Sequence, residues 1–546
     1  MTSLVVSTWL VSFTVKFAGG YTLKVKDYLQ IEKATNISRS EVGRLGTAIL
    51  FVVAVILYTG TKYAHVDQLF LLIAAAVIGA YMAMNIGAND VANNVGPAVG
   101  SYALTLTGAI VIAAIFEAAG AIIAGGDVVS TVKKGIIDPA NVSDPNVFIW
   151  VMMGALIGAA LWLNTATWLG APVSTTHSIV GGVMGAGIAA VGWDVVNWDS
   201  MGKIALSWVV SPVTGGIIAA LFLFILKKTI FFKDDLIENA RKVVPFMIGI
   251  MTWAFTTYIA LKGIKKLIKI DFTTAMLIGL VVGLVAIIIV RPMINAAAPK
   301  LENSTEGVNK LFTIPLIISA ALLSFAHGAN DVANAVGPLA GVVDALTQTE
   351  GGASKVAIPL WVMVIGAIGI SIGLALFGPK LIRTVGSEIT ELDRSRAFCI
   401  ALAAAITVII ASQLGMPISS THVALGAVFG VGFLREFLET RMGKVVEDVL
   451  HKHEGEKDFA VAEQVLMTFR NAPVEDKQRM LTELKKMGPE AVIDAAERKV
   501  LQKALKRQLV HRASLFKIVS AWIITVPVSA VLAALFYFVL RGMMLP

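Results

Sequence analysis

The chain carries one seven-residue segment twice, and this duplication constrains its fold more than any other feature. Gly-Ala-Asn-Asp-Val-Ala-Asn occurs at 87–93 and again at 328–334, and the copies stay identical through the following Val-Gly-Pro except at Asn94 and Ala335. A second pair of motifs, Pro-x-Ser-[Ser/Thr]-Thr-His, follows at 172–177 and 417–422. Two motifs repeated in the same order indicate an internal duplication. We therefore expect two repeats of one fold.

The residues around both motifs are those of a membrane protein. Of 546 residues, 56% are hydrophobic and only 15% are charged, whereas soluble chains carry about 25% charged residues. Several apolar runs reach the roughly 20 residues that cross a bilayer as a helix. The net charge of +8 comes from basic residues in the loops between these runs, which is typical of cytoplasmic loops and does not indicate nucleic-acid binding. The sequence thus predicts an all-α polytopic membrane protein.

The apolar runs and the duplication together predict the domain organisation. We expect an N-terminal extension with one extra span (1–66), a first repeat (67–226), linking spans (227–310), the first part of a second repeat (311–436), a polar insertion with helical periodicity (437–515) and the last span of the second repeat (516–546). The apolar stretch 1–22 is consistent with either an interfacial helix or a further span. Four more positions match between the repeats at one constant offset, namely Gly120, Gly125, Thr131 and Val132 with Gly373, Gly378, Thr384 and Val385.

The distribution of charge predicts how the two repeats face the membrane. If each Ser/Thr-His segment makes a net crossing, the basic loops 227–242 and 380–396 and the insertion 437–515 all lie in the cytoplasm, as the positive-inside rule prefers. The two repeats are then inverted. The loop from Lys262 to Lys269 violates the rule. If the segments instead enter and return on one side, the inversion is lost.

The Asn-Asp motif places a carboxylate and amides at membrane depth. An aspartate there costs about 2.5–3.5 kcal/mol on insertion scales, so it usually faces a cavity or an ion. Oxygens at this spacing suit a hard monovalent cation, or a proton on the aspartate. The alternative is that these residues only cap helix ends. We predict cation sites that include Asn89, Asp90, Asn93, Asn330, Asp331 and Asn334.

The Ser/Thr-His motif has the sequence of a helix start inside the bilayer. A helix N-terminus with hydroxyl groups is suited to bind an anion, and transporters use half-helix ends at the bilayer midplane in this way. The alternative is that the hydroxyls only satisfy carbonyls at a kink. We predict a site for an oxyanion formed by Ser174, Thr175, Thr176, Ser419, Ser420 and Thr421.

Neither motif contains Lys or Arg, so the anion and the cation would each stabilise the other's site. This favours coupled transport of the two. His177 and His422 are candidates to orient the anion or are structural donors. Glu117, in the second span of the first repeat, is a candidate proton carrier, gate or buried pairing residue.

At these residues the chain resembles the inorganic phosphate transporter (PiT) family, as a bacterial member. The resemblance also includes Phe116-Glu117 and the segment 133–138, and it spans most of 67–436 and 516–541. It implies inverted repeats with broken or re-entrant helices, and secondary transport of inorganic phosphate coupled to sodium or protons. It assigns Asp90, Asn93, Asp331 and Asn334 to the cation, with sodium at the two aspartates, and the six hydroxyl residues to phosphate. Ala401 stands where animal members have a glutamate, so Glu117 has no repeat partner.

Other functions fit the sequence less well. The same scaffold transporting sulfate or another tetrahedral oxyanion is the nearest alternative. An ion channel is disfavoured because repeated broken helices around one site suggest alternating access. We predict no enzyme, because P-loop and His-Glu-x-x-His motifs are absent. The single cysteine, Cys399, excludes an internal disulfide and a cysteine-based metal site.

The expected setting follows from these predictions. The protein would lie in the cell (inner) membrane as a multi-pass protein, with 437–515 in the cytoplasm as a small helical insertion. Its partners would be inorganic phosphate, a monovalent cation and the lipid bilayer, without nucleic acid and without a cofactor. A homo-oligomer is compatible with the sequence.

Overall fold

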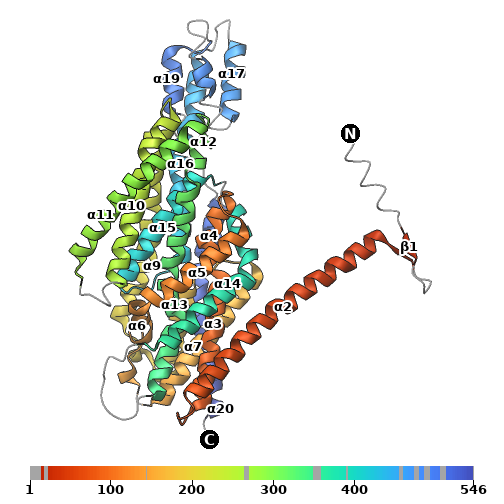
Figure 1. Ribbon diagram of the computed structural model, residues 1–546, viewed down its shortest axis with the longest axis vertical. Coiled ribbons are helices and arrows are strands. Elements are labelled where there is room, and N and C mark those ends of the chain that lie inside the picture. Colours follow the sequence, from red (N-terminus) through yellow and green to blue (C-terminus); the bar gives the residue numbers. More distant parts are fainter. Residues whose placement is uncertain are drawn as a thin grey trace. The chain divides into compact units, whose positions relative to one another are not determined.

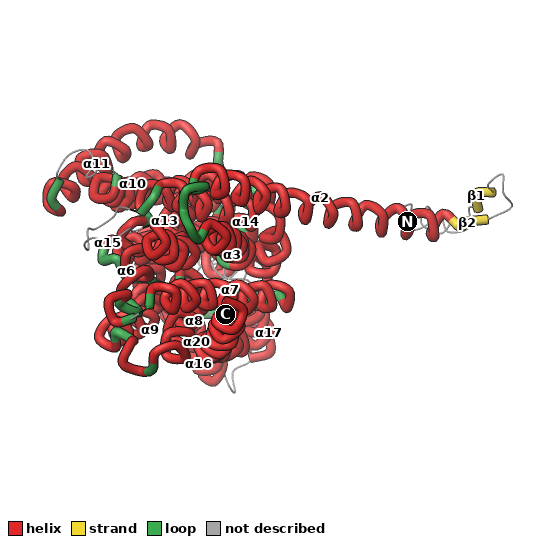
Figure 2. Tube along the Cα trace, turned by 90° about the horizontal axis from the view of Figure 1, so that it is seen from below, coloured by secondary structure: helices red, strands yellow, loops and turns green. Residues whose placement is uncertain are grey.

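The computed structural model describes residues 14–16, 22–142, 144–263, 270–347, 358–388, 392–453, 459–472, 479–484, 492–504 and 512–544. Within these ranges the chain is helical almost throughout, apart from two short strands near the N-terminus (Figure 2). Eleven helical segments in the described part are long and apolar enough to cross a membrane. The predicted all-α, multi-pass membrane fold is therefore confirmed.

Residues 1–62 form one compact unit. Strand β1 (Thr14–Lys16) pairs antiparallel with β2 (Thr22–Lys24), and helix α2 (Val25–Lys62) follows. The last part of α2, Val42–Lys62, is apolar enough to be a span. An interfacial helix or further span within 1–22 was expected, but the described residues 14–16 are a strand; residues 1–13 and 17–21 lie outside the described part.

The second unit, Tyr63–Pro546, contains both repeats. The first repeat consists of α3 (Leu69–Asn89), α4 (Val91–Gly100), α5 (Leu106–Ala124), α6 (Gly126–Lys134), α7 (Pro145–Leu169), α8 (Thr175–Val191) and α9 (Trp198–Leu226). The linking helices are α10 (Leu236–Lys262), α11 (Phe272–Ala297) and α12 (Thr305–Leu311). The second repeat consists of α13 (Thr313–Thr347), α14 (Leu360–Glu388), α15 (Arg394–Gln413), α16 (Ser420–Lys452) and α20 (Arg512–Met544).

Each repeat contains a helical hairpin, and the two hairpins run in opposite directions. In the first, α8 returns to the end of the molecule at which α7 begins. This is shown by a hydrogen bond of 2.9 Å from the amide of Asn197, which follows α8, to the carbonyl of Ile136, which precedes α7. In the second, α16 runs from the hairpin tip towards the helices α17 (Phe459–Asn471) and α19 (Ala495–Ala504), at the end opposite α6 (Figure 1). The two repeats are thus inverted, as expected. The Ser/Thr-His segments nevertheless return within hairpins and make no net crossing, so the assumption behind the charge argument was wrong, and the inversion follows from the directions of the hairpins.

Glycines let the two repeats pack backbone against backbone. A Cβ atom on Gly87 of α3 would lie 1.9 Å from the carbonyl oxygen of Ile370 in α14. In the mirrored pair, a Cβ on Gly328 of α13 would lie 2.1 Å from the carbonyl oxygen of Glu117 in α5. Small residues allow such close approach between helices in lipid. Because these glycines open the two Asn-Asp motifs, the same contacts bring both motif copies into the centre of the molecule.

The polar insertion has a hydrophobic core of its own. Its buried residues come from the distal part of α16, from α17, from α19 and from 479–493: Val446, Val449, Ala462, Leu466, Phe469, Leu481, Leu484, Ile493 and Leu501. The predicted helical insertion is therefore present. Helix α16 crosses the expected boundary at 436/437 without a break, so the hairpin tip at Ser420 and the insertion share one helix. The other predicted domain boundaries remain predictions.

Candidate functional site

The first Asn-Asp motif interrupts a helix, whereas the second does not. Helix α3 ends at Asn89 and α4 begins at Val91, with Asp90 in the turn between them. In the second repeat, α13 continues through Asp331 from Thr313 to Thr347. The helix is therefore interrupted at the aspartate only in the first copy. Both aspartates are buried.

The Ser/Thr-His motifs begin helices at the hairpin tips, as their sequence predicts. Ser174 caps α8, with its hydroxyl oxygen accepting the amide N–H of His177 at 3.1 Å. Ser419 caps α16 in the same way and accepts from His422 at 3.2 Å. An N-cap of this kind satisfies one of the free amides of the first turn. The two serines thus fix mirrored helix ends that meet at the centre of the protein.

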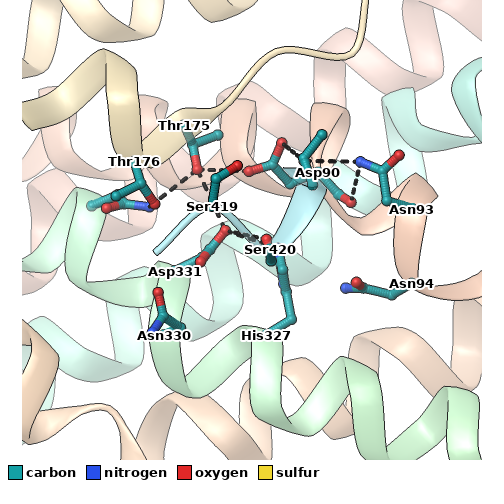
Figure 3. A network of polar contacts seen from close by, with 12 residues as sticks. Asp90, Asn93, Asn94, Thr175, Thr176, His327, Asn330, Asp331, Ser419 and Ser420 are labelled. Carbon is teal, nitrogen blue, oxygen red and sulfur yellow. Dashed lines mark hydrogen bonds and ion pairs between the residues drawn. The ribbon is translucent and has the colours of Figure 1, made fainter. Parts of the chain in front are cut away.

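The Asp90 carboxylate accepts hydrogen bonds from both hairpin tips (Figure 3). The hydroxyl of Thr175 donates to Oδ2 at 2.6 Å. The hydroxyl of Thr421, from the other repeat, donates to Oδ1 at 2.9 Å. Asp90 therefore joins the two repeats at their tips.

The Asp331 carboxylate has a different set of partners (Figure 3). The hydroxyl of Ser420 donates to Oδ2 at 2.9 Å, and the same oxygen lies 3.0 Å from Nε2 of His327. The Thr175 hydroxyl is 3.4 Å away, so it lies between the two aspartates. Within the described residues, the other oxygen, Oδ1, is buried without a hydrogen-bond partner.

Two amides cross between the repeats. Asn93 donates from Nδ2 to the hydroxyl of Thr421 at 2.9 Å. Its mirror residue Asn334 donates to the hydroxyls of Thr175 and Thr176, each at 3.1 Å. In the described part of the chain, the Oδ1 atoms of both asparagines are buried and have no hydrogen-bond partner. Buried polar atoms without partners are rare in proteins, so these oxygens are candidates to bind a ligand.

Asn89 and Asn330 lie beside the site but use their amides elsewhere. Asn89 donates to the Thr167 hydroxyl at 2.8 Å and accepts the amide of Val173 at 3.2 Å. Asn330 likewise donates to the Ser412 hydroxyl at 3.1 Å and accepts the amide of Ile418 at 3.3 Å. Both side chains therefore hold the hairpin connections in place. Each Oδ1 accepts a single N–H and keeps a second lone pair, so the cation-ligand role expected from the spacing stays a prediction.

Glu117 belongs to a buried polar chain that the sequence did not reveal. Its Oε2 lies 2.6 Å from Nδ1 of His327, and its Oε1 accepts from Nδ2 of Asn94 at 2.8 Å. Glu117 and His327 are both fully buried. His327 continues the chain to Asp331. Of the three roles considered for Glu117, the geometry agrees with the buried pairing role.

His177 and His422 lie behind the hairpin tips. Their rings are 4.4 Å apart in an edge-on arrangement, and Trp208 lies 3.9 Å from the His177 ring. Both line an apolar cavity of about 830 Å³ between α8, α9, α16 and α20. The hydroxyl groups and the two aspartates of the site do not line this cavity. Contact of these imidazoles with an anion at the site therefore remains a prediction.

The charge of the site is concentrated in its two aspartates. Asp90, Asp331 and His327 each offer a ligand atom, and these atoms lie within 4.8 Å of one another. Two like charges at that distance repel by about 3 kcal/mol at an effective dielectric constant of about 20. Among the described residues, no Lys or Arg forms an ion pair with either aspartate; the buried Lys133 pairs with Asp344 and the buried Lys262 with Asp127. A bound cation or a proton would relieve this repulsion.

Comparison with known proteins gives one consistent result. The profile of the phosphate transporter family matches residues 86–533. A Helicobacter pylori (strain J99) protein whose name contains the words phosphate permease is 49% identical over 524 residues, covering 94% of this chain and 98% of that protein. A similarly named Pyrococcus abyssi protein is 42% identical over 364 residues, covering 67% of this chain and 89% of that protein.

A solved structure agrees with these relatives. A sodium-dependent phosphate transporter is 33% identical and superposes with a TM-score of 0.68, covering 87% of this chain and 100% of that one. The relatives are transporters and not enzymes, as predicted. The chain belongs to the phosphate transporter family.

Proposed function

We propose that the protein couples the entry of sodium to the transport of inorganic phosphate. The observation that carries this proposal is the position of Asp90, which accepts hydroxyl hydrogen bonds from the tips of both inverted hairpins. Anion-binding groups and cation-binding groups thereby share one buried centre. A site of this composition suits a salt pair, an oxyanion together with its counter-cation, better than either ion alone.

The hairpin tips are the proposed phosphate site. The hydroxyls of Thr175, Thr176, Ser420 and Thr421 all lie in the central network and are buried. The first-turn amides of α8 and α16 lack partners within their own helices, and the positive end of each helix dipole favours an anion. Ser174 and Ser419 contribute by capping these helices. An oxyanion between the tips would thus be held by neutral donors from both repeats.

The oxygens beside the hydroxyls are the proposed cation site. Oδ1 of Asp331 and the Oδ1 atoms of Asn93 and Asn334 are buried acceptors without hydrogen-bond partners in the described residues. Carboxylate and amide oxygens are the ligands preferred by hard cations. Asp90 completes the negative charge of the site. Asn89 and Asn330 are left out of the proposed set because their amides hold the hairpin connections.

The hydrogen bonds provide a physical reason for coupling. A hydroxyl has one proton to donate, and those of Thr175, Thr421 and Ser420 are directed to the aspartates. Sodium at the carboxylates would take over the neutralisation that these donors provide. The hydroxyls would then be free to donate to phosphate. Each ion would in this way make the site favourable for the other.

Phosphate fits the site better than sulfate does. Near neutral pH phosphate retains a proton and can donate a hydrogen bond, whereas sulfate only accepts. The two aspartates beside the tips are acceptors, so they would bind a protonated phosphate and repel sulfate. The phosphate transporter profile and the names of the relatives support the same choice.

Sodium is proposed over the proton for two reasons. The solved structure to which the chain is similar is a sodium-dependent phosphate transporter. Buried carboxylate and amide oxygens without hydrogen-bond partners in the described residues, such as Asp331 Oδ1, are the type of ligand that a hard metal cation takes. We further propose that the protein lies in the cell (inner) membrane, with 437–515 in the cytoplasm, because the basic loops then face inward.

The test is radiolabelled phosphate uptake into proteoliposomes with the sodium and pH gradients imposed separately. We expect uptake to require an inward sodium gradient and to be inhibited weakly by sulfate. If a pH gradient drives uptake in the absence of sodium, the coupling ion is the proton and not sodium. Equal inhibition by sulfate and phosphate would contradict the proposed role of the aspartates.

A further inference from the structure

Three of the buried positions at which the two halves of the site differ are linked to one another by contacts. The first repeat has Ile86 where the second has His327, and the second has Ala335 and Ile370 where the first has Asn94 and Glu117. The three polar residues of these pairs are far apart in the sequence. In the structure they form one chain of contacts, from Asn94 to Glu117, from Glu117 to His327 and from His327 to Asp331. The site is therefore symmetric in its tips but not in what lies behind them.

These buried contacts give the two aspartates different hydrogen-bond partners. Both oxygens of Asp90 accept from hydroxyls at the hairpin tips. One oxygen of Asp331, Oδ2, accepts a hydrogen bond from Ser420 and lies at the ion-pair distance of 3.0 Å from Nε2 of His327, whereas its Oδ1 has no hydrogen-bond partner among the described residues. Glu117 holds the His327 ring from its other nitrogen at 2.6 Å. Fixing one ring nitrogen in this way sets the orientation of the other, as with histidines beside metal sites.

Resting on the proposed function, we propose that Glu117 and His327 are positioning residues that dedicate the Asp331 half of the site to the cation. His327 fixes Oδ2 and so leaves Oδ1 of Asp331 as a pre-oriented ligand for sodium. The Asp90 half, whose two oxygens both face hairpin hydroxyls, serves the phosphate side. Neither Glu117 nor His327 touches the transported ions; they act through Asp331.

The proposal predicts that substitutions at Glu117 and His327 change the sodium dependence of uptake but not its phosphate dependence. Loss of an outer partner of a metal ligand costs at least about tenfold in metal affinity. His327→Ile should therefore raise the half-saturating sodium concentration about tenfold, while the half-saturating phosphate concentration at saturating sodium changes little. His327→Gln retains an N–H donor for Asp331 and should restore part of the sodium affinity.

Two further variants make the test specific. The double variant Glu117→Ile/His327→Ile gives each position the residue of its counterpart in the other repeat and removes both members of the buried Glu117–His327 pair at once, although Asn94 then loses its acceptor. Glu117→Gln keeps the size of the side chain and its acceptor for Asn94. Ser324→Ala is the matched control, because Ser324 is a buried residue of the same helix outside the chain of contacts.

Sodium and phosphate titrations of uptake in proteoliposomes separate the outcomes, with thermal stability in detergent measured in parallel. Wild-type uptake that does not depend on sodium would overturn the proposed function itself. Sodium-dependent wild-type uptake with unchanged sodium titrations in Glu117→Gln and His327→Ile would overturn the positioning role alone. Equal loss of sodium and phosphate affinity would also overturn it, since that result indicates a general structural role. If the double variant is not folded, Glu117→Gln decides.

Discussion

Replacing Thr421 by valine tests the contact on which the coupling proposal depends. The substitution keeps the shape of the side chain and removes its hydroxyl, which donates to Asp90 Oδ1 at 2.9 Å and accepts from Asn93 at 2.9 Å. A hydrogen bond to a charged partner contributes about 1.5–3 kcal/mol. If the hydroxyl binds phosphate in the loaded site, its loss should cost about 2 kcal/mol, which corresponds to a roughly thirtyfold weaker phosphate affinity.

The assay is radiolabelled phosphate uptake into proteoliposomes, titrated with phosphate at saturating sodium and with sodium at saturating phosphate. Thr421→Ser retains the hydroxyl and should stay close to wild type. Thr407→Val is the matched control, because this buried hydroxyl bonds only to the carbonyl of Ala403 within α15, at 2.8 Å. An unchanged phosphate titration in Thr421→Val, or an effect of equal size in Thr407→Val, would refute the proposed role of the hairpin tips.

Three further predictions concern charge, packing and pH. Asp90→Asn and Asp331→Asn should each abolish sodium-coupled phosphate uptake, measured in the same vesicles, whereas wild-type uptake in both would remove the cation site. Gly328→Ala should lower thermal stability by about 1–3 kcal/mol through overpacking, because its Cβ would lie 2.1 Å from the Glu117 carbonyl; Gly126→Ala, with nothing within 4 Å, should be neutral in the same melting assay. At Asp393, before α15, burial raises the pKa of the carboxyl, but the Arg396 guanidinium and amide outweigh it, so that pKa lies below its usual value. The stability contributed by the Asp393 carboxylate should therefore be present at neutral pH and lost as pH falls through that lowered pKa, so melting curves of wild type and Asp393→Ala should converge in acid and not at pH 7.

The sequence was sufficient to predict the parts of the site that depend on local rules. Duplication, apolar length and proline before a hydroxyl run are local patterns, and they predicted the two repeats, the membrane spans and the helix starts at 174 and 419. The hydrogen bonds from both hairpin tips to Asp90 could not be predicted in this way. They depend on how the two repeats pack against each other, and local sequence patterns carry no information about that packing.

The chain of Asn94, Glu117 and His327 was missed for a physical reason. Glu117 and His327 are 210 residues apart and belong to different repeats, so no spacing rule connects them. The signal was present in the differences between the copies, since each of these residues replaces an apolar or small residue of the other repeat. The bonds of Asn89 and Asn330 to the hairpin connections were likewise not predicted, because they also depend on how distant segments pack.

The arrangement of the site also bears on why transport would be coupled. The bonds between the tips cross from one repeat to the other, as Thr421 to Asp90 and Asn334 to Thr176 do. Opening the centre to either face must therefore separate some of these pairs and remove a donor from a buried carboxylate. An aspartate that loses its donor inside a membrane protein is unfavourable by several kcal/mol unless a cation takes its place. Opening an empty or half-loaded site would then be disfavoured by the loss of these hydrogen bonds, and the proposed coupling of sodium to phosphate would need no separate gate.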